Sequence, residues 1–249
     1  MELEKTVERI VPKNFKSREE YLLYLRHVFV YEVLKYKLKD SDQVLEIGFG
    51  EGYGTHLISG YVDSVIGLDV EEKAVEYANK KYGSGNCSFQ TYDGSKIPFE
   101  ENTFDSIVSY QVIEHVEKDE NFLKEIHRVL QDQGKLYLTT PNRLHRLAPG
   151  EEPWNPFHER EYSPERLREL MDNIFSEVNI FGVNAEQEVW QIEVDRVKRG
   201  ITLKKLMPNA LKRFIYGDFM NQYDTDSFFL DEDASTGLDL FAICTKKKN

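Results

Sequence analysis

The most constraining feature of the chain is a glycine-rich turn that directly follows an apolar run. Residues 44–47 read Val-Leu-Glu-Ile, and glycine then occupies every second position from Gly48 to Gly54. A second apolar run ends in Asp69, 19 residues after Gly50. Glycines allow a tight turn and the close approach of a ligand to the backbone. An acid after the second strand is placed to accept hydrogen bonds from ribose hydroxyls. The pattern therefore predicts a site for a ligand that contains a nucleoside.

The spacing of the glycines separates two kinds of nucleoside ligand. A dinucleotide fingerprint needs G-x-G-x-x-G, with a third glycine where the helix packs closely on the strand. The third position here is Tyr53, so a nicotinamide-dependent oxidoreductase is disfavoured. The pattern from Glu46 to Gly52 is E-x-G-x-G-x-G, which resembles the first motif of class I S-adenosylmethionine-dependent methyltransferases.

Length and composition narrow the class further. The 249 residues are enough for one α/β domain with a sizeable core. A formal net charge of −12 argues against a nucleic-acid partner, because binding to phosphates needs a basic surface. The two cysteines have no metal-binding spacing, and no apolar run approaches the ~20 residues of a transmembrane helix. We expect a cytoplasmic protein with reduced thiols.

The chain alternates strand and helix patterns from residue 43 onward, which predicts a mainly parallel sheet with right-handed crossovers. Ser17 and Glu20 form a capping box that opens an N-terminal helix over 17–39. Ser163 and Pro164 open a later helix. Strands are predicted over 43–47, 64–69, 86–91, 104–109, 134–140, 176–183 and 238–245, and helices over 52–60, 71–82 and 118–130.

These elements predict a single α/β domain with a three-layer, Rossmann-like architecture. Its seven-stranded sheet is mostly parallel, and the last strand is antiparallel. The core comprises residues 43–183 and 237–246, and residues 184–236 are expected to form a helical cap inserted into it.

The predicted cap carries two segments of opposite charge. Residues 196–216 contain seven basic residues and no acid, whereas residues 218–239 contain seven acids and no basic residue. The two segments could pair with each other or across a homodimer. Alternatively, the basic segment could cover an anionic acceptor through Arg199 and Lys205, or make peripheral contact with anionic lipid.

Further motifs extend the resemblance over residues 43–142. They are Asp93-Gly94, the sequence Ser-Tyr-Gln-Val-Ile-Glu-His-Val at 109–116, and Thr-Thr-Pro-Asn at 139–142. In their order and spacing the chain resembles the class I S-adenosylmethionine-dependent methyltransferases of the small-molecule type. It is similar in particular to the group that acts in ubiquinone and menaquinone biosynthesis.

The resemblance implies that the cofactor is S-adenosyl-L-methionine, which becomes S-adenosyl-L-homocysteine. Asp69 would hold the ribose hydroxyls, Asp93 would accept from the adenine amino group, and the backbone of Gly94 would face the adenine ring. The other implied cofactor residues are Glu46, Gly48, Gly50, Gly52, Val70, Ser109 and Tyr110. A structural alternative stays open, in which the glycines serve only the turn, Asp69 caps the next helix and Asp93 ends a strand.

Acceptor groups are expected after the fourth and fifth strands, because ligands in open α/β sheets bind beyond the carboxyl ends of the strands. His115 follows the fourth strand, and His158 and Tyr162 follow the fifth. His158 is the preferred base or acceptor-orienting residue, since histidine titrates near neutrality. It could instead pin the loop before the helix at Ser163. The candidate acceptor contacts in the same region are Asn142, Arg143 and His145.

A metal site is not expected. Some relatives carry Glu-x-x-Glu-His at this place and bind a divalent metal with it. This chain has Gln111 in the first acidic position, before Glu114 and His115. The loss of one carboxylate weakens a site for a hard cation.

The sequence therefore predicts an enzyme that transfers a methyl group from S-adenosylmethionine to an oxygen or nitrogen of a small metabolite. The acceptor is expected to be anionic, phosphorylated or sugar-linked. Two alternatives stay open: a methyltransferase that acts on a lipid or lipid-linked acceptor, and a non-catalytic partner module with the same fold.

Overall fold

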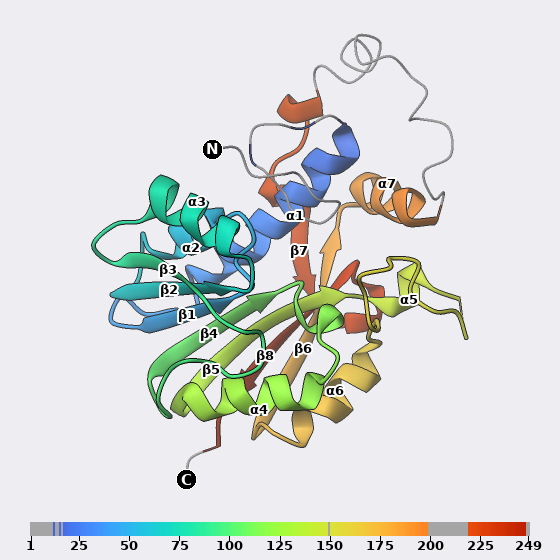
Figure 1. The fold of residues 1–249 in the computed structure, drawn as a ribbon. Helices are drawn as coiled ribbons and strands as arrows, with labels where there is room; N and C mark the ends of the chain where they lie inside the picture. Colours follow the sequence, from blue (N-terminus) through green and yellow to red (C-terminus); the bar gives the residue numbers. More distant parts are fainter. Residues whose placement is uncertain (1–11, 13–14, 16, 149, 199–218, 248–249) are drawn as a thin grey trace.

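The computed structural model describes residues 12, 15, 17–148, 150–198 and 219–247 (Figure 1). Two of the predicted acceptor contacts, Arg199 and Lys205, and most of the basic segment 196–216 lie outside these residues.

The described chain forms one α/β sheet with helices on both faces. The strands are β1 (Gln43–Ile47), β2 (Ser64–Asp69), β3 (Cys87–Thr91), β4 (Phe104–Tyr110), β5 (Leu130–Pro141), β6 (Glu177–Ala185), β7 (Phe228–Asp231) and β8 (Asp239–Thr245). The α-helices are α1 (Arg18–Leu34), α2 (Tyr53–Ile58), α3 (Glu72–Tyr82), α4 (Asp119–Val129), α5 (Arg143–Arg146), α6 (Pro164–Asp172) and α7 (Gln187–Lys198). The short 3₁₀ helices are η1 (Ile113–His115), η3 (Phe219–Asn221), η4 (Thr225–Ser227) and η5 (Ala234–Thr236).

The order of the strands is β3-β2-β1-β4-β5-β8-β6-β7. Neighbouring strands from β3 to β5 are parallel, whereas β8 runs antiparallel to both β5 and β6. The predicted mainly parallel, Rossmann-like sheet with an antiparallel last strand is thus confirmed. The predicted number of seven strands is wrong, because the described sheet has eight. The additional strand is β7, which pairs antiparallel with β6 at the edge of the sheet. It lies inside the segment that was expected to be a helical cap.

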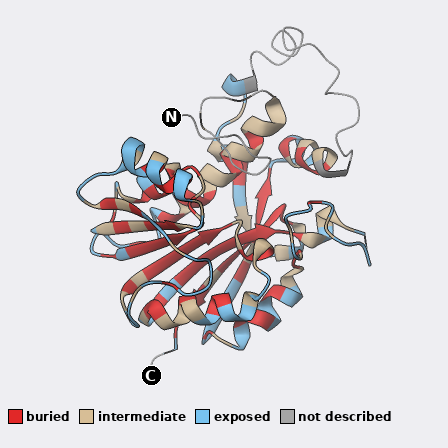
Figure 2. Cartoon of the chain, in the orientation of Figure 1, coloured by how far each residue is buried: buried red, intermediate tan, exposed pale blue. Residues whose placement is uncertain are grey.

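Two clusters of buried apolar side chains hold the helices against the sheet, whose central strands are mostly buried in Figure 2. On one face, α4 and α6 pack on the central strands through side chains such as Phe122, Ile126 and Met171. On the other face, α1, α2 and α3 pack through Leu34, Ile58 and Ala78. None of the described helices has both the length and the apolar composition that crossing a membrane would require.

The predicted serine cap at the start of the N-terminal helix is confirmed. Ser17 caps α1, and its hydroxyl accepts from the backbone N–H of Glu20 at 3.2 Å. The helix ends at Leu34, earlier than the predicted residue 39. The chain after it turns toward β1, and the backbone N–H of Leu38 donates to the carbonyl of Leu34.

A buried cluster of charges joins α7 to α1 and to β8. Arg26 of α1 lies 2.6 Å from Glu193 of α7 and 2.8 Å from Asp239 of β8, and all three side chains are almost inaccessible. Arg196, the first residue of the predicted basic segment, also pairs with Glu193 at 3.2 Å. The first helix of the predicted cap is therefore fixed to the core by ion pairs.

The glycine turn is tied to α1 by a close contact. The hydroxyl of Tyr31 donates to Glu46 at 2.6 Å, which pins the tyrosine ring. A Cβ atom built on Gly54 at the start of α2 would lie 2.1 Å from Cζ of that ring. Only glycine therefore fits at this position.

We predict that Gly54→Ala lowers the free energy of unfolding by about 1–3 kcal/mol, the usual cost of overpacking a core. The pinned Tyr31 ring cannot move aside without breaking its hydrogen bond. The measurement is the urea midpoint compared with that of Gly85→Ala, where a Cβ would meet no atom within 4 Å. Equal midpoints for the two variants would show that the Tyr31 contact does not constrain the turn.

Candidate functional site

The turn after β1 has the backbone geometry that its glycines predict. Gly48, Gly50 and Gly52 have φ values of 79°, 61° and 95°, a region that other residues rarely adopt. A Cβ on Gly50 would point into open space, whereas a Cβ on Gly48 would overlap the side chain of Val112. The space beside the half-buried Gly50 is therefore open, and a bound cofactor can approach the backbone there.

Asp69 lies directly against this turn at the end of β2. Its Oδ2 accepts from the backbone N–H of Gly50 at 3.1 Å, and its Oδ1 accepts from Glu71 at 3.0 Å. A carboxylate at this place, beside a glycine turn, is where an acceptor of ribose hydroxyls is expected, and the predicted ribose contact of Asp69 stays a prediction. The next residue, Val70, is apolar yet 62% exposed, which suits contact with a flat ring. The arrangement fits the adenosine part of S-adenosylmethionine.

Asp93 and Gly94 lie beside Val70 in the chain after β3. Gly94 has a φ of 78°, and a Cβ on it would lie 3.2 Å from the Val70 side chain. Oδ1 of Asp93 accepts from the backbone N–H groups of Ser95 and Lys96 at 2.8 and 3.0 Å. These bonds lower the pKa of Asp93, which therefore stays an acceptor. Its predicted contact with the adenine amino group stays a prediction.

Glu46 faces the helices on both of its oxygens. Oε1 accepts from Tyr31 at 2.6 Å, and Oε2 accepts from Thr55 at 2.5 Å. Burial raises the pKa of Glu46 to about 7, although both hydrogen bonds oppose this shift. The structure thus explains the motif glutamate as a link between the sheet, α1 and α2. Its predicted contact with the cofactor stays a prediction.

The end of β4 is held in an unusual backbone conformation. Ser109 is fully buried, and the Tyr110 hydroxyl donates to the carbonyl of Val30, away from the sheet edge. Gln111 then has a φ of 57°, and its backbone N–H donates to the Thr139 carbonyl at 2.9 Å. Strained non-glycine residues gather at functional sites. The backbone at Ser109 and Tyr110, predicted to line the methionyl part, therefore leads into a constrained turn.

The two predicted histidines meet beyond the ends of β4 and β5. The rings of His115 and His158 lie edge to face, with centroids 4.8 Å apart. Nδ1 of His115 lies 2.9 Å from the carbonyl oxygen of Phe157, and Nδ1 of His158 lies 3.1 Å from Oε1 of Glu161. Glu114 is buried beside them, and this burial raises its pKa to about 7.

The loop that carries His158 is fastened to η1. The backbone N–H of Glu159 donates to the Glu114 carbonyl at 2.8 Å, and the guanidinium of Arg160 donates to the carbonyls of Val116 and Glu117. His158 is therefore brought to His115 by backbone hydrogen bonds, across more than 40 residues of sequence. Its ring belongs to a polar cluster at the predicted acceptor edge, and both roles proposed for it, as a base and as a structural histidine, stay predictions.

The other predicted acceptor residues make mainly internal contacts. Tyr162 is fully buried, and its hydroxyl donates to Asp119 at 2.9 Å. Asn142 is also fully buried and donates to the Gly237 carbonyl at 2.8 Å. Arg143 donates to the Glu151 carbonyl, and Nε2 of His145 lies 2.9 Å from the carbonyl oxygen of Ser235. Their roles in catalysis or acceptor binding stay predictions, and the contacts favour structural roles for Tyr162 and Asn142.

Metal ligands are present in part at this edge. Glu114, His115 and His158 offer ligand atoms that all lie within 4.8 Å of one another. The amide of Gln111, in the position of the missing acid, donates to Thr139 Oγ1 at 3.2 Å. Without an acid at position 111, the group of possible ligands consists of one carboxylate and two imidazoles. The expectation that the reaction needs no metal stays a prediction.

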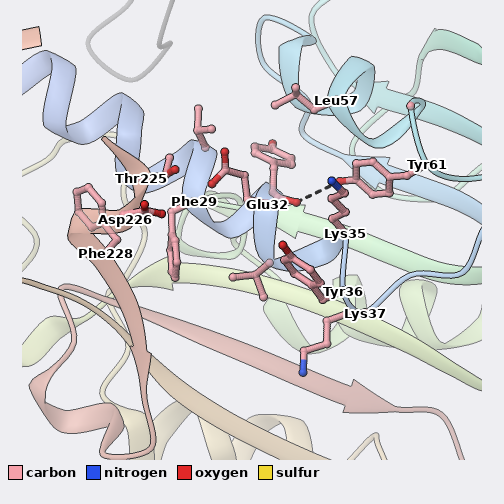
Figure 3. A pocket seen from close by; sticks show the side chains of 14 residues that line it. Phe29, Glu32, Lys35, Tyr36, Lys37, Leu57, Tyr61, Thr225, Asp226 and Phe228 are labelled. Atoms are coloured by element: carbon pink, nitrogen blue, oxygen red, sulfur yellow. Dashed lines mark hydrogen bonds between the residues drawn. The ribbon is translucent and has the colours of Figure 1, made fainter. Parts of the chain in front are cut away.

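A separate groove of about 1050 Å³ lies between α1, η4 and the end of α2 (Figure 3). Phe29 and Glu32 of α1 face Asp226 and Phe228 across it, and Tyr61 borders it beyond α2. None of the predicted site residues lines this groove. It lies at the end of α2 opposite to the glycine turn, so it is distinct from the candidate site.

A sheet of this topology, with a glycine turn and an acid at the ends of β1 and β2, defines a cofactor-binding Rossmann-like protein. Residues 45–138 match the methyltransferase domain family. A probable S-adenosylmethionine-dependent methyltransferase of Mycolicibacterium smegmatis is 36% identical over 174 residues, which cover 70% of this chain and 65% of that protein. The juvenile hormone acid O-methyltransferase of Bombyx mori is 25% identical over 170 residues, which cover 59% and 61%.

Solved structures show the same fold. YcgJ of Bacillus subtilis superposes with a TM-score of 0.56 at 18% identity, covering 90% of this chain and 99% of that one. An S-adenosylmethionine-dependent methyltransferase of Thermotoga maritima has a TM-score of 0.60 at 18% identity, covering 92% and 94%. The family match, these relatives and the shared fold together support a class I S-adenosylmethionine-dependent methyltransferase. It spans 58–65% of the length of the three mycobacterial relatives it matches. The narrower likeness to the ubiquinone and menaquinone group stays a prediction.

Sequence reasoning missed several residues that build the site. Tyr31 and Thr55 bind Glu46, Gln111 takes the constrained backbone, and Glu161 contacts His158. The contacts of Tyr31 and Glu161 depend on helices and loops whose packing no local pattern reveals. Only the short spacing between Glu161 and His158 could have drawn attention to that pair.

We predict that Asp69→Ala weakens binding of S-adenosylmethionine by at least about 10-fold, because a hydrogen bond to a charged group contributes about 1.5–3 kcal/mol. Isothermal titration calorimetry measures the affinity, and thermal unfolding checks that the turn stays folded without the bond to Gly50. The matched control is Asp63→Ala, an exposed acid in the loop before β2. Wild-type affinity in the Asp69 variant would rule out the ribose contact.

Proposed function

We propose that the protein transfers the methyl group of S-adenosyl-L-methionine to an oxygen or nitrogen of a small, anionic metabolite. The observation that carries this proposal is the shared edge of the sheet. The glycine turn with Asp69 and the polar cluster of His115 and His158 both lie beyond the carboxyl ends of the parallel strands. The shared edge supports the proposal, because the candidate cofactor residues and the candidate base then lie on the same side of one sheet.

The chain's own residues supply binding, positioning and a base. The bound cofactor supplies a methyl carbon that its sulfonium already activates. Asp69 and the glycine turn hold it, and positioning of this kind can account for much of the rate of a displacement reaction. Where the acceptor atom carries a proton, His158 takes it. Nδ1 of this histidine faces Glu161, so Nε2 is the nitrogen that receives the proton.

The relatives support methyl transfer and leave the acceptor open. The Bombyx mori relative is by its name an O-methyltransferase of juvenile hormone acid, which is consistent with an anionic acceptor. Other relatives are named as sterol C-methyltransferases. These names favour the alternative of a lipid acceptor. Within the described residues, Arg146 and Arg26 are already paired with carboxylates. An anionic acceptor would therefore rely on the predicted Arg143, Arg199 and Lys205.

The test of the function uses S-adenosylmethionine with a labelled methyl group and a cell extract separated by size and polarity. Label in small polar metabolites is expected, and mass spectrometry then identifies the product. Label in the lipid fraction would favour the lipid alternative. Bound cofactor without label in any fraction, from several extracts, would favour the non-catalytic module.

We predict that His158→Gln lowers kcat by about 100-fold, a typical contribution of a general base. The KM for S-adenosylmethionine should stay close to that of the wild type, because His158 is not part of the glycine turn. The control is His56→Gln, an exposed histidine of α2. Undiminished turnover in the His158 variant would dismiss the base.

We also predict that excess EDTA leaves turnover unchanged. Gln111 stands where metal-binding relatives have an acid, and its amide is turned to Thr139. A single carboxylate with two imidazoles lacks the oxygen ligands that Mg²⁺ prefers. Loss of activity on chelation, restored by one divalent metal, would contradict this expectation and assign the cluster to a metal.

A further inference from the structure

We propose that the groove beside α1 is where a second copy of this chain docks, so that two copies form a dimer with two-fold symmetry. This is the groove bordered by Phe29 and Glu32 of α1, by Asp226 and Phe228, and by Tyr61 (Figure 3). In the dimer, the exposed turn that follows α1 in each copy enters the groove of the other. The contact is separate from the candidate site and does not depend on the identity of the methyl acceptor.

One face of α1 lines the groove and is not covered by the rest of the described chain. Val28, Phe29, Glu32 and Tyr36 all border the groove, and their spacing of three and four residues places them on one side of the helix end. Tyr36 is 84% exposed, and Leu57 across the groove is 42% exposed. Large apolar side chains that gather at one hollow, rather than being scattered, indicate a surface for association.

A projecting turn stands at the rim of the same groove. Residues 35–37 follow the end of α1 at Leu34, and all three are exposed. The backbone N–H groups of Tyr36 and Lys37 donate to the carbonyls of Val33 and Leu34, which fixes the turn on the helix. One surface thus holds both a hollow and a projection. A two-fold axis beside the helix end lets the projection of each copy fill the hollow of the other, as an isologous contact requires.

The charged side chains of the groove also complement a second copy. Glu32 and Asp226 carry negative charges, whereas Lys35 and Lys37 carry positive charges. Figure 3 shows Glu32 on the side of Asp226 and Lys35 on the side of Tyr61. Within the part of the chain that the structure describes, no ion pair joins any of these four side chains to another residue. A two-fold axis near the end of α1 therefore brings Glu32 of each copy opposite Lys35 of the other, and both ion pairs form at once.

The local charge balance distinguishes this face within an acidic protein. The whole chain has a formal net charge of −12, which makes the approach of two copies repulsive over most of the surface. In the groove the two acids and the two lysines cancel, so a second copy meets no net repulsion there. An occupant with charges of one sign would leave either the acids or the lysines unpaired. The mixed charges therefore favour a second copy over a uniformly basic or acidic partner.

The nearby edge strand β7 is a poorer place for a second copy. It lies at the end of the strand order, but it is only four residues long. Asp226 precedes it, and Asp231, Glu232 and Asp233 stand at its end. Two β7 strands paired with each other would bring these acids together, and such charges are a common protection of sheet edges. The groove is therefore the surface on which two copies are expected to meet.

Sedimentation velocity of the full chain over a series of micromolar concentrations tests the proposal. The wild type is expected to pass from monomer to dimer as the concentration rises. Tyr36→Ser should weaken the dimer at least about 10-fold, because each dimer loses two aromatic anchors. Since Tyr36 is 84% exposed in the single chain, its truncation removes no core contact. Thermal unfolding of a dilute, monomeric sample should therefore match that of the wild type.

Charge reversal tests whether the occupant is a second copy. Glu32→Lys alone and Lys35→Glu alone each place like charges in both contacts, so each variant is expected to stay monomeric. An equal mixture of the two variants should form a heterodimer within about 10-fold of the wild-type affinity, because both contacts again join opposite charges. The matched controls are Glu76→Lys and Lys80→Glu on the exposed side of α3, which change the net charge by the same amounts. Each control should keep the wild-type dimer.

Three results would overturn the proposal. A wild type that stays monomeric at every concentration would leave the groove to a different occupant, such as a small ligand or another protein. A dimer that persists in both Glu32→Lys and Tyr36→Ser would place the contact on another surface. A mixture of the two charge variants that stays monomeric would show that Glu32 does not meet Lys35 of the other copy.

Discussion

A buried carboxylate at the end of the first strand connects the parts from which the cofactor site is built. Glu46 accepts hydrogen bonds from Tyr31 of α1 and Thr55 of α2, the two helices on either side of the glycine turn. A buried carboxylate without such donors would be very costly, so the three residues depend on one another. Tyr31 also lies against Gly54, where no Cβ fits. The turn is thereby fixed before any ligand binds, with the backbone of Gly50 directed toward Asp69.

Parallel pairing of β1, β2 and β4 then decides which residues can cooperate. The chain segments that follow these strands emerge at one edge, so Gly50, Asp69 and Gln111 gather there although they are distant in sequence. The segments after β4 and β5 add His115 and His158 to the same edge, and backbone hydrogen bonds to Glu114 bring the two histidines together. The glycine turn with Asp69 and the two histidines therefore share one edge of the sheet because of strand direction.

Local patterns predicted most of the strands and helices. The strands 43–47 and 64–69 agree with β1 and β2 at both ends, because each is a short apolar run bounded by turn residues. The edge strand β7 was missed, since its four residues lie in an acidic stretch and become a strand only by pairing with β6. The candidate site shows the same division. Asp69 and the glycines form a pattern that can be read from one short stretch of sequence. The contact between His158 and Glu161 depends instead on how a buried loop folds.

The sequence by itself determined the fold class and the cofactor, because glycine spacing and strand–helix alternation are local properties that limit what the backbone can do. It also placed the two histidines after the strands whose ends form the site. Only the tertiary structure decided which polar groups act on one another. Glu46 turned toward the helices, Tyr162 became buried against Asp119, and Glu161 came to face His158. These outcomes depend on burial and on contacts between distant segments, which set hydrogen-bond partners and pKa values that no single stretch of sequence encodes.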